Sequence, residues 1–450
     1  MNLFEKVFII IAFITLFIFL FKRACVDLSF RKLNPINLSF YYLLFFAIIG
    51  GCVIFLGFKD HYLIHYMRED AITRAFWLLI ITSLELPLFI WLFNKTQKIN
   101  NFSTYYSDYI SKEFILDANT SNSVFEYTCI LSVICVISLA YTFHYIGYVP
   151  VIELMKGKFY LLSDRISISR EFKGNIYIRN IIALGLTPIL SYLAYIYYKL
   201  TKENRWKWLF IVLLILSIMA KTYDFSKGPV ILYLIYFYFI EVLLGNANLN
   251  KKLIRYVVAV IVGILAMYYG ILGYTGRLLN LTNGPLARLV ITYIAGYFLS
   301  IQTFPYRSPF LNGASFPSAF AKLFGLSQGG IRSGRILMTT YLSKSVENGT
   351  GDVMNSLYVG EAYSNFGIVG AIIAPIIVAF CLSVIPNLIL RLRKTPLNVT
   401  LYVFFTFTYI NCLMGGFVDF IYNPQLIMIT IIISIGVLVA QKGHIYFLKY

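Results

Sequence analysis

The segment Gly360-Glu361-Ala362-Tyr363-Ser364-Asn365-Phe366-Gly367 decides how this chain is arranged. It closes a longer segment, residues 274–370, which is the one long interruption in a sequence that is otherwise almost continuously apolar. Apolar runs lie on both sides of this interruption. We therefore expect membrane helices that hold a polar segment at a membrane surface.

Composition places the chain in a membrane. Hydrophobic residues make up 59% of it and charged residues 13%, whereas a soluble domain usually carries about a quarter charged residues. We predict a single all-α, polytopic integral membrane domain over residues 1–450, with about eleven transmembrane helices of about 20 residues each. The predicted spans are 5–22, 38–57, 75–93, 124–146, 180–199, 207–223, 228–244, 254–273, 366–389, 398–416 and 424–441.

The distribution of basic residues predicts the topology. If each span crosses once, the loops rich in Lys and Arg all fall on one side of the membrane, and that side is cytoplasmic. These loops are 22–37, 199–207, 245–255 and 390–397. The N-terminus is then outside, and the two largest external loops are residues 149–180 and 274–365.

Both large external loops are also basic, and the chain has a net charge of +18. Basic residues on the translocated side work against this orientation, so they need another reason, and an anionic ligand is the simplest one. A guanidinium binds two phosphate oxygens at once, although each arginine could instead pair with lipid headgroups or with local acids. The candidate anion-binding residues are Arg165, Arg170, Arg277, Arg288, Arg332 and Arg335, together with Lys227 in a short external turn.

Two carboxylates are candidate catalytic groups. Asp224 stands in the turn that also holds Lys227, and Glu361 stands just before a predicted span. A carboxylate partly desolvated at the outer membrane surface is suited to act as a general base. The alternatives are a local ion pair for Asp224 and, for Glu361, an acidic residue that complements a helix N-terminus. Tyr363 and Asn365 are candidate substrate-binding residues.

The long loop contains one apolar segment, residues 286–304. We expect it to be a helix lying in the membrane interface or a re-entrant hairpin buried against the bundle. Three prolines after it divide the loop into short pieces, and the Ser- and Gly-rich residues 327–334 suggest a mobile lid.

The residues 360–370 resemble the signature that precedes a late span in the oligosaccharide repeat unit polymerases, the Wzy-type O-antigen polymerases. Tyr148-Val149-Pro150-Val151-Ile152, followed by an Arg-containing loop, resembles the first substrate loop of that family. Ser226-Lys227-Gly228-Pro229 stands where family members often have an Arg-Gly pair, with lysine as the cation here. The likeness covers about residues 140–375 as a pattern.

This resemblance implies a glycosyltransferase with a GT-C-like membrane fold, in the bacterial cytoplasmic membrane, with its active site facing outward. The donor would be a growing glycan on undecaprenyl diphosphate, and the acceptor a single lipid-linked repeat unit. Arg165, Arg170, Arg277 and Arg288 would hold the lipid diphosphates. No cofactor, metal or nucleic acid is implied, whereas membrane lipids and a chain-length regulator protein would be partners.

Two other functions stay open. An O-antigen ligase shares the architecture but, as a family expectation, uses a histidine in its long external loop, and residues 274–370 contain none. A flippase for lipid-linked oligosaccharides typically has an even number of spans, short loops and ionisable residues inside its bundle. The long external loop argues against the flippase.

Overall fold

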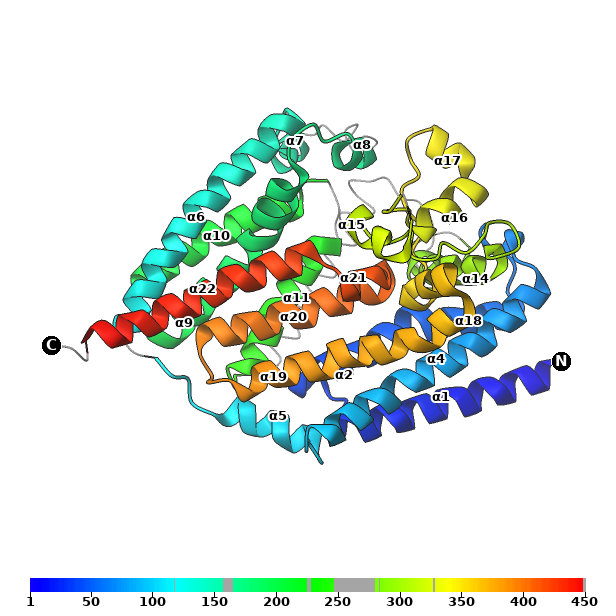
Figure 1. Cartoon of the computed structure of the whole chain (residues 1–450), viewed down its shortest axis with the longest axis horizontal. Coiled ribbons are helices and arrows are strands. Elements are labelled where there is room, and N and C mark those ends of the chain that lie inside the picture. Colours follow the sequence, from blue (N-terminus) through cyan, green and yellow to red (C-terminus); the bar gives the residue numbers. More distant parts are fainter. Residues whose placement is uncertain are drawn as a thin grey trace. The chain divides into compact units, whose positions relative to one another are not determined.

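The computed structural model describes residues 1–116, 118–156, 165–224, 228–246, 280–282, 284–326 and 328–447. Over these residues the chain forms helices joined by turns, without a strand (Figure 1). Eight of the described helices are long and apolar enough to cross a membrane, which makes this an all-α polytopic membrane protein. They are Leu3–Lys32, Pro35–Phe55, Glu69–Thr96, Ser121–Ile146, Ile178–Thr201, Leu357–Arg391, Pro396–Gly415 and Val418–Ala440.

Three of the predicted spans are not among these eight. Span 207–223 corresponds to α10 (Asn204–Lys221), which carries three basic residues, and span 228–244 corresponds to the shorter apolar helix α11 (Gly228–Leu243). Span 254–273 lies outside the described residues.

The chain divides into two compact units, each built from separate stretches of sequence. Unit 1 consists of Met1–Ser107, Asn248–Asn387 and Thr406–Tyr422, and unit 2 of Asp108–Ala247, Leu388–Phe405 and Asn423–Tyr450. In unit 2, α9 (Thr187–Thr201) packs on α10, while α6 (Ala118–Ile146) packs on α22 (Pro424–Phe447) and on the π-helical turn η5 (Ile178–Leu186).

Unit 1 is built around α4 (Glu69–Thr96), which contacts α1 (Leu3–Cys25), α14 (Tyr293–Thr303) and α18 (Leu357–Ala379) (Figure 1). Helices α2 (Pro35–Leu43) and α3 (Ile49–Phe55) continue into each other through a π-helical turn. Close approach here depends on glycine, because a Cβ on Gly50 would lie 1.8 Å from the carbonyl oxygen of Val290.

The apolar segment 286–304 is buried against other helices of unit 1, as one of the two alternatives expected, but it does not turn back on itself as a hairpin. It is one continuous helical segment, since α13 (Pro285–Ala287), the π-helical turn η7 (Arg288–Thr292) and α14 follow each other without leaving helical backbone angles. Every residue from Ile294 to Thr303 is buried, and α14 packs against both α4 and α18.

Side-chain hydrogen bonds explain why a polar residue is tolerated in this buried helix. The Gln302 amide donates to the Tyr66 carbonyl at 2.7 Å and accepts from the Arg68 backbone N–H at 2.7 Å. Hydropathy alone counts Gln302 as a reason to keep the helix at the surface, but a buried amide with partners costs little.

Candidate active site

Helix α18 (Leu357–Ala379) is interrupted near its middle. Phe366 (φ −131°, ψ 16°) and Gly367 (φ 62°, ψ −148°) leave the helical region, and the conformation of Gly367 is one that essentially only glycine adopts. The helix resumes after Gly367. A break in a buried part of a helix frees backbone groups that must find partners within the protein.

The loop after α14 supplies those partners. The backbone N–H of Leu311 donates to the Ser364 carbonyl at 2.9 Å, and that of Asn312 donates to the Asn365 carbonyl at 3.0 Å. The Asn365 side chain accepts from the Gly313 N–H at 3.1 Å and donates to Ser315 Oγ at 2.9 Å. The interruption of α18 and the path of this loop therefore depend on each other.

A second interruption lies close to the first half of α18. Helix α20 (Pro396–Gly415) ends at Gly416, whose φ of 150° again requires glycine, and the short helix α21 (Val418–Ile421) follows. A Cβ on Gly416 would lie 2.3 Å from Glu361 Oε2. Glycine at this position lets the chain pass directly over the Glu361 carboxylate.

Three charged side chains meet between the two interruptions. Arg332 Nη1 lies 3.0 Å from Glu361 Oε1 and 3.2 Å from Glu361 Oε2, and Arg332 Nη2 lies 2.5 Å from Asp419 Oδ1. The Val418 N–H donates to Glu361 Oε2 at 3.1 Å. We call Arg332, Glu361 and Asp419 the charged cluster; its formal charge is −1 because one cation faces two carboxylates.

Exposure differs sharply within the charged cluster. The Glu361 side chain is 3% exposed, whereas Arg332 is 33% and Asp419 28% exposed. Burial by itself would lower the pKa of Arg332, but the carboxylates of Glu361 and Asp419 raise that pKa above its ordinary value, so the guanidinium stays charged. The buried Glu361 holds the Arg332 guanidinium in place, and the partly exposed Asp419 is the carboxylate that a ligand can approach.

A basic and an aromatic side chain, Arg74 and Tyr306, lie near Tyr363 in unit 1. Arg74 Nη1 donates to the Tyr306 hydroxyl at 2.6 Å, and its guanidinium also lies 5.0 Å from the centre of that ring. Tyr306 is exposed. Tyr363 is buried, with its ring edge-on to Phe310 at 5.8 Å between centroids. Exposed tyrosine next to arginine suits the binding of a polar, ring-containing ligand.

The predicted site residues fall into several places. Arg332, Glu361, Tyr363 and Asn365 lie together in unit 1, but the Asn365 side chain is fully buried and its amide bonds to the loop and to the Glu361 carbonyl. Arg335 donates to the carbonyls of Gly351 and Asp352, so it fastens the loop that follows α17 (Ser343–Glu347).

The other predicted site residues lie in other parts of the described chain or outside the described residues. Arg288 is exposed on η7 in unit 1, Arg170 is exposed at the end of α8 (Arg165–Arg170) in unit 2, and Asp224 lies in the turn after α10 in unit 2. The side chain of Arg165, and Lys227 and Arg277 entirely, lie outside what the structure describes. Of the predicted lid, residues 328–334 are described, and the Ile331 N–H donates to the Ala314 carbonyl at 2.8 Å.

Sequence reasoning missed Asp419. One signal could have found it, because Asp419 is the sole acidic residue in positions 362–450 and stands three residues after Gly416, at the end of a predicted span. An isolated carboxylate at the end of a membrane helix is a functional candidate by default.

No protein-family model matches the chain, and neither the curated proteins nor the solved structures contain a match to it.

Proposed function

We propose that this protein is a membrane-embedded glycosyltransferase that joins lipid-linked oligosaccharide repeat units into a surface polysaccharide, O-antigen or a related polymer. The observation that carries the proposal is the charged cluster. In it, the partly exposed Asp419–Arg332 ion pair is held by the buried Glu361, between two interruptions of helical structure. The resemblance of residues 360–370 to the repeat unit polymerases supports the same activity.

The chemistry assigns a role to each member of the cluster. An acceptor hydroxyl attacks the anomeric carbon of the donor glycan, the bond from that carbon to the phosphate oxygen breaks, and undecaprenyl diphosphate leaves. Asp419 would take the hydroxyl proton as general base. Arg332 orients Asp419, and Glu361 positions Arg332, which changes the role first expected for Glu361 from base to positioning residue.

The diphosphate needs a different set of cations. Arg332 already faces two carboxylates, and a cluster with a formal charge of −1 repels an anion. The leaving group would therefore be held by arginines of the external loops. Arg170 and Arg288 are exposed in the structure. Arg165 and Arg277 are further candidates from the sequence. Because both substrates are anchored lipids, lateral capture would supply much of their orientation.

The test is the length of the surface glycan made in a deletion strain that carries single variants. We expect Asp419→Asn to leave single repeat units instead of a ladder, with the protein still in the membrane at its normal level. Glu203→Gln is the matched control, because Glu203 forms a surface ion pair with Arg205 in unit 2. A normal ladder with Asp419→Asn would refute the proposed base.

One observation favours a second function. A discontinuous membrane helix with a buried ionisable residue, such as α18 with Glu361, is also typical of secondary transporters. A flippase for the same lipid-linked units would use the charged cluster to move its substrate. The same strain separates the two: loss of all surface glycan with Asp419→Asn, single units included, favours the flippase.

A further inference from the structure

A groove of about 230 Å³ lies between the C-terminal parts of α1 and α4. It is lined by Phe19, Leu20, Arg23, Pro87, Leu88 and Trp91. Phe19 and Leu88 are 54% and 40% exposed, so the groove opens onto an apolar surface that a bilayer would cover.

Basic residues gather at one end of the groove. Two cations lie over the Trp91 ring, with the Arg23 guanidinium 4.8 Å and the Lys95 ammonium 4.1 Å from its centre. In the described part of the chain, no carboxylate lies within 4.0 Å of the charged nitrogens of Arg23 or Lys95. These two positive charges are therefore not neutralised by ion pairs.

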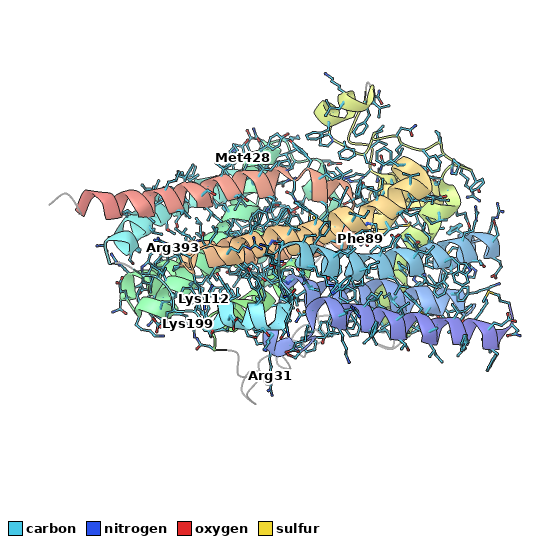
Figure 2. The ribbon with its side chains drawn as sticks, turned by 60° about the horizontal axis from the view of Figure 1, so that its bottom comes forward. Arg31, Phe89, Lys112, Lys199, Arg393 and Met428 are labelled. Atoms are coloured by element: carbon cyan, nitrogen blue, oxygen red, sulfur yellow. The ribbon has the colours of Figure 1, made fainter. Side chains whose placement is uncertain are left out.

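The same end of unit 1 carries further exposed cations. The C-termini of α1 and α4 meet there, because Asn94 Nδ2 donates to the Ala24 carbonyl at 3.3 Å. Lys22 and Lys98 are exposed at these two ends. Arg31, in the turn η1 (Phe30–Lys32) after α1, points away from the helices (Figure 2).

We propose that this groove binds an anionic glycerophospholipid, with an acyl chain along Phe19, Leu20 and Leu88 and its phosphate between Arg23 and Lys95. Charge complementarity selects this occupant, since an anionic lipid supplies a negative charge that no nearby carboxylate supplies. A zwitterionic lipid would bring its own ammonium group next to two cations. Tryptophan at the boundary of apolar and polar surface is suited to the headgroup level.

Trp91 is the reporter for the test. The full-length protein is placed in nanodiscs of phosphatidylcholine that contain a small fraction of either brominated phosphatidylglycerol or brominated phosphatidylcholine, and bromine quenching of tryptophan fluorescence is followed. The signal of Trp91 among the four tryptophans is the difference between the protein and its Trp91→Phe variant. We expect brominated phosphatidylglycerol to quench Trp91 at a much lower fraction than brominated phosphatidylcholine.

The cations are tested by the double variant Arg23→Gln/Lys95→Gln, read by the same difference. It should lose the preference for the anionic lipid, by roughly fivefold for each cation removed. The control Lys202→Gln/Lys207→Gln removes the same charge from exposed positions in unit 2 and should keep the preference. Arg23→Lys keeps the charge and should keep most of the preference, which separates charge loss from misfolding.

Three results would overturn this proposal. Equal quenching by the two brominated lipids would mean that the groove does not select an anion. A preference that survives in the double variant would mean that Arg23 and Lys95 do not create it. Displacement of brominated phosphatidylglycerol by stoichiometric polyprenyl diphosphate, but not by excess unlabelled phosphatidylglycerol, would assign the groove to a different lipid.

Discussion

At the scale of single residues, Gly416 shows how the charged cluster depends on an absent side chain. Its φ of 150° and the 2.3 Å distance from an added Cβ to Glu361 Oε2 act together. The backbone strain of a substituted residue costs about 1–3 kcal/mol, and Glu361 would also have to move away from Arg332. The arrangement of Arg332 therefore rests on a residue that contributes no atom to the site.

We predict that Gly416→Ala destabilises unit 1 by about 1–3 kcal/mol and abolishes polymer formation. The chain offers a matched control in Gly415→Ala, because a Cβ at Gly415 would meet Asp419 Oδ2 at an ordinary 3.6 Å. Thermal unfolding in detergent and the surface-glycan ladder are the two measurements. Equal effects of the neighbouring substitutions would contradict the steric account.

His61 is a second residue whose surroundings set its charge. It is 1% exposed, and its Nδ1 accepts the Leu63 backbone N–H at 3.3 Å, so the neutral imidazole is the form that fits. Burial, with a smaller contribution from the charge of His65, lowers the pKa of His61. The folded state thus binds fewer protons at His61 than the unfolded state does.

This difference fixes the sign of a pH effect. Stability should rise with pH between the lowered folded pKa and the unfolded value of about 6.5, and fall as the pH drops through that window. We predict that His61→Asn, whose side-chain oxygen can still accept the Leu63 N–H, flattens the decline in thermal stability below about pH 6.5. His65→Asn, at an exposed position, should retain most of the decline, and an unchanged slope in His61→Asn would count against the buried neutral imidazole.

At the scale of elements, the interruption of α18 is the feature on which the site depends. The first half of the helix carries Glu361, and the freed carbonyls of Ser364 and Asn365 fasten residues 311–313. Closing the break would require those carbonyls to bond within the helix and would release the loop. Interrupted helices are tolerated in membranes where protein buries them, as it does here.

We predict that Gly367→Ala, at a φ of 62° and ψ of −148°, disrupts this junction at a cost of about 1–3 kcal/mol. The loop around residues 311–313 should become sensitive to limited proteolysis, and polymer should be lost. Gly228→Ala in α11 is the control, since nothing lies within 4 Å of an added Cβ there. Proteolysis that is unchanged in Gly367→Ala would mean that the loop is held by other contacts.

The same elements separate what the sequence could predict from what it could not. Apolar length correctly predicted an all-α membrane protein, and the position of Glu361 before an apolar run drew attention to the segment that forms part of the charged cluster. The break itself was not predictable, because it is stabilised by residues about fifty positions earlier in the chain. For a similar reason the sequence left two alternatives open for the segment that contains α14, since the hydrogen-bond partners of Gln302, Tyr66 and Arg68, are distant in sequence.

The charged cluster shows the same division. Its residues come from three separate segments, and only their fold brings Arg332 to Glu361 and Asp419. The sequence selected Arg332 as a phosphate ligand on the basis of charge, and the structure pairs it with two acids. The residue type predicts that a loop position carries a charge. Whether that charge is neutralised depends on contacts with segments that are distant in sequence.

At the scale of the whole molecule, unit 1 places its two proposed sites at opposite ends of α4. Near the N-terminus of α4, Arg74 donates a hydrogen bond to the Tyr306 hydroxyl. Tyr306 belongs to the loop after α14, which also contacts the break in α18. At the C-terminus, Lys95 lies over Trp91, and Phe93 packs edge-on against Phe380 in the turn after α18. The 28 residues of α4 extend for about 42 Å at about 1.5 Å per residue, enough to cross a bilayer.

Because the two proposed sites lie at opposite ends of α4, the orientation of the protein in the membrane decides which of them faces outward. The positive-inside rule predicts that the basic end of α1 and α4 is cytoplasmic, which would turn the lipid groove to the inner leaflet and the charged cluster outward. Polymerisation at the outer face requires that orientation. In the opposite one, the charged cluster would lie in the cytoplasm, away from substrates presented on the outer leaflet.

We therefore predict the labelling pattern of single cysteines in a variant whose six native cysteines are replaced. Asn348→Cys, exposed on the loop after α17, should react with a membrane-impermeant maleimide in intact cells. Thr96→Cys at the end of α4 and Lys207→Cys in α10, both exposed, should react only after the membrane is opened. Labelling of Thr96→Cys but not Asn348→Cys in intact cells would show the opposite orientation. The charged cluster would then face the cytoplasm, away from the proposed reaction, because α4 can present only one of its ends to the outer face.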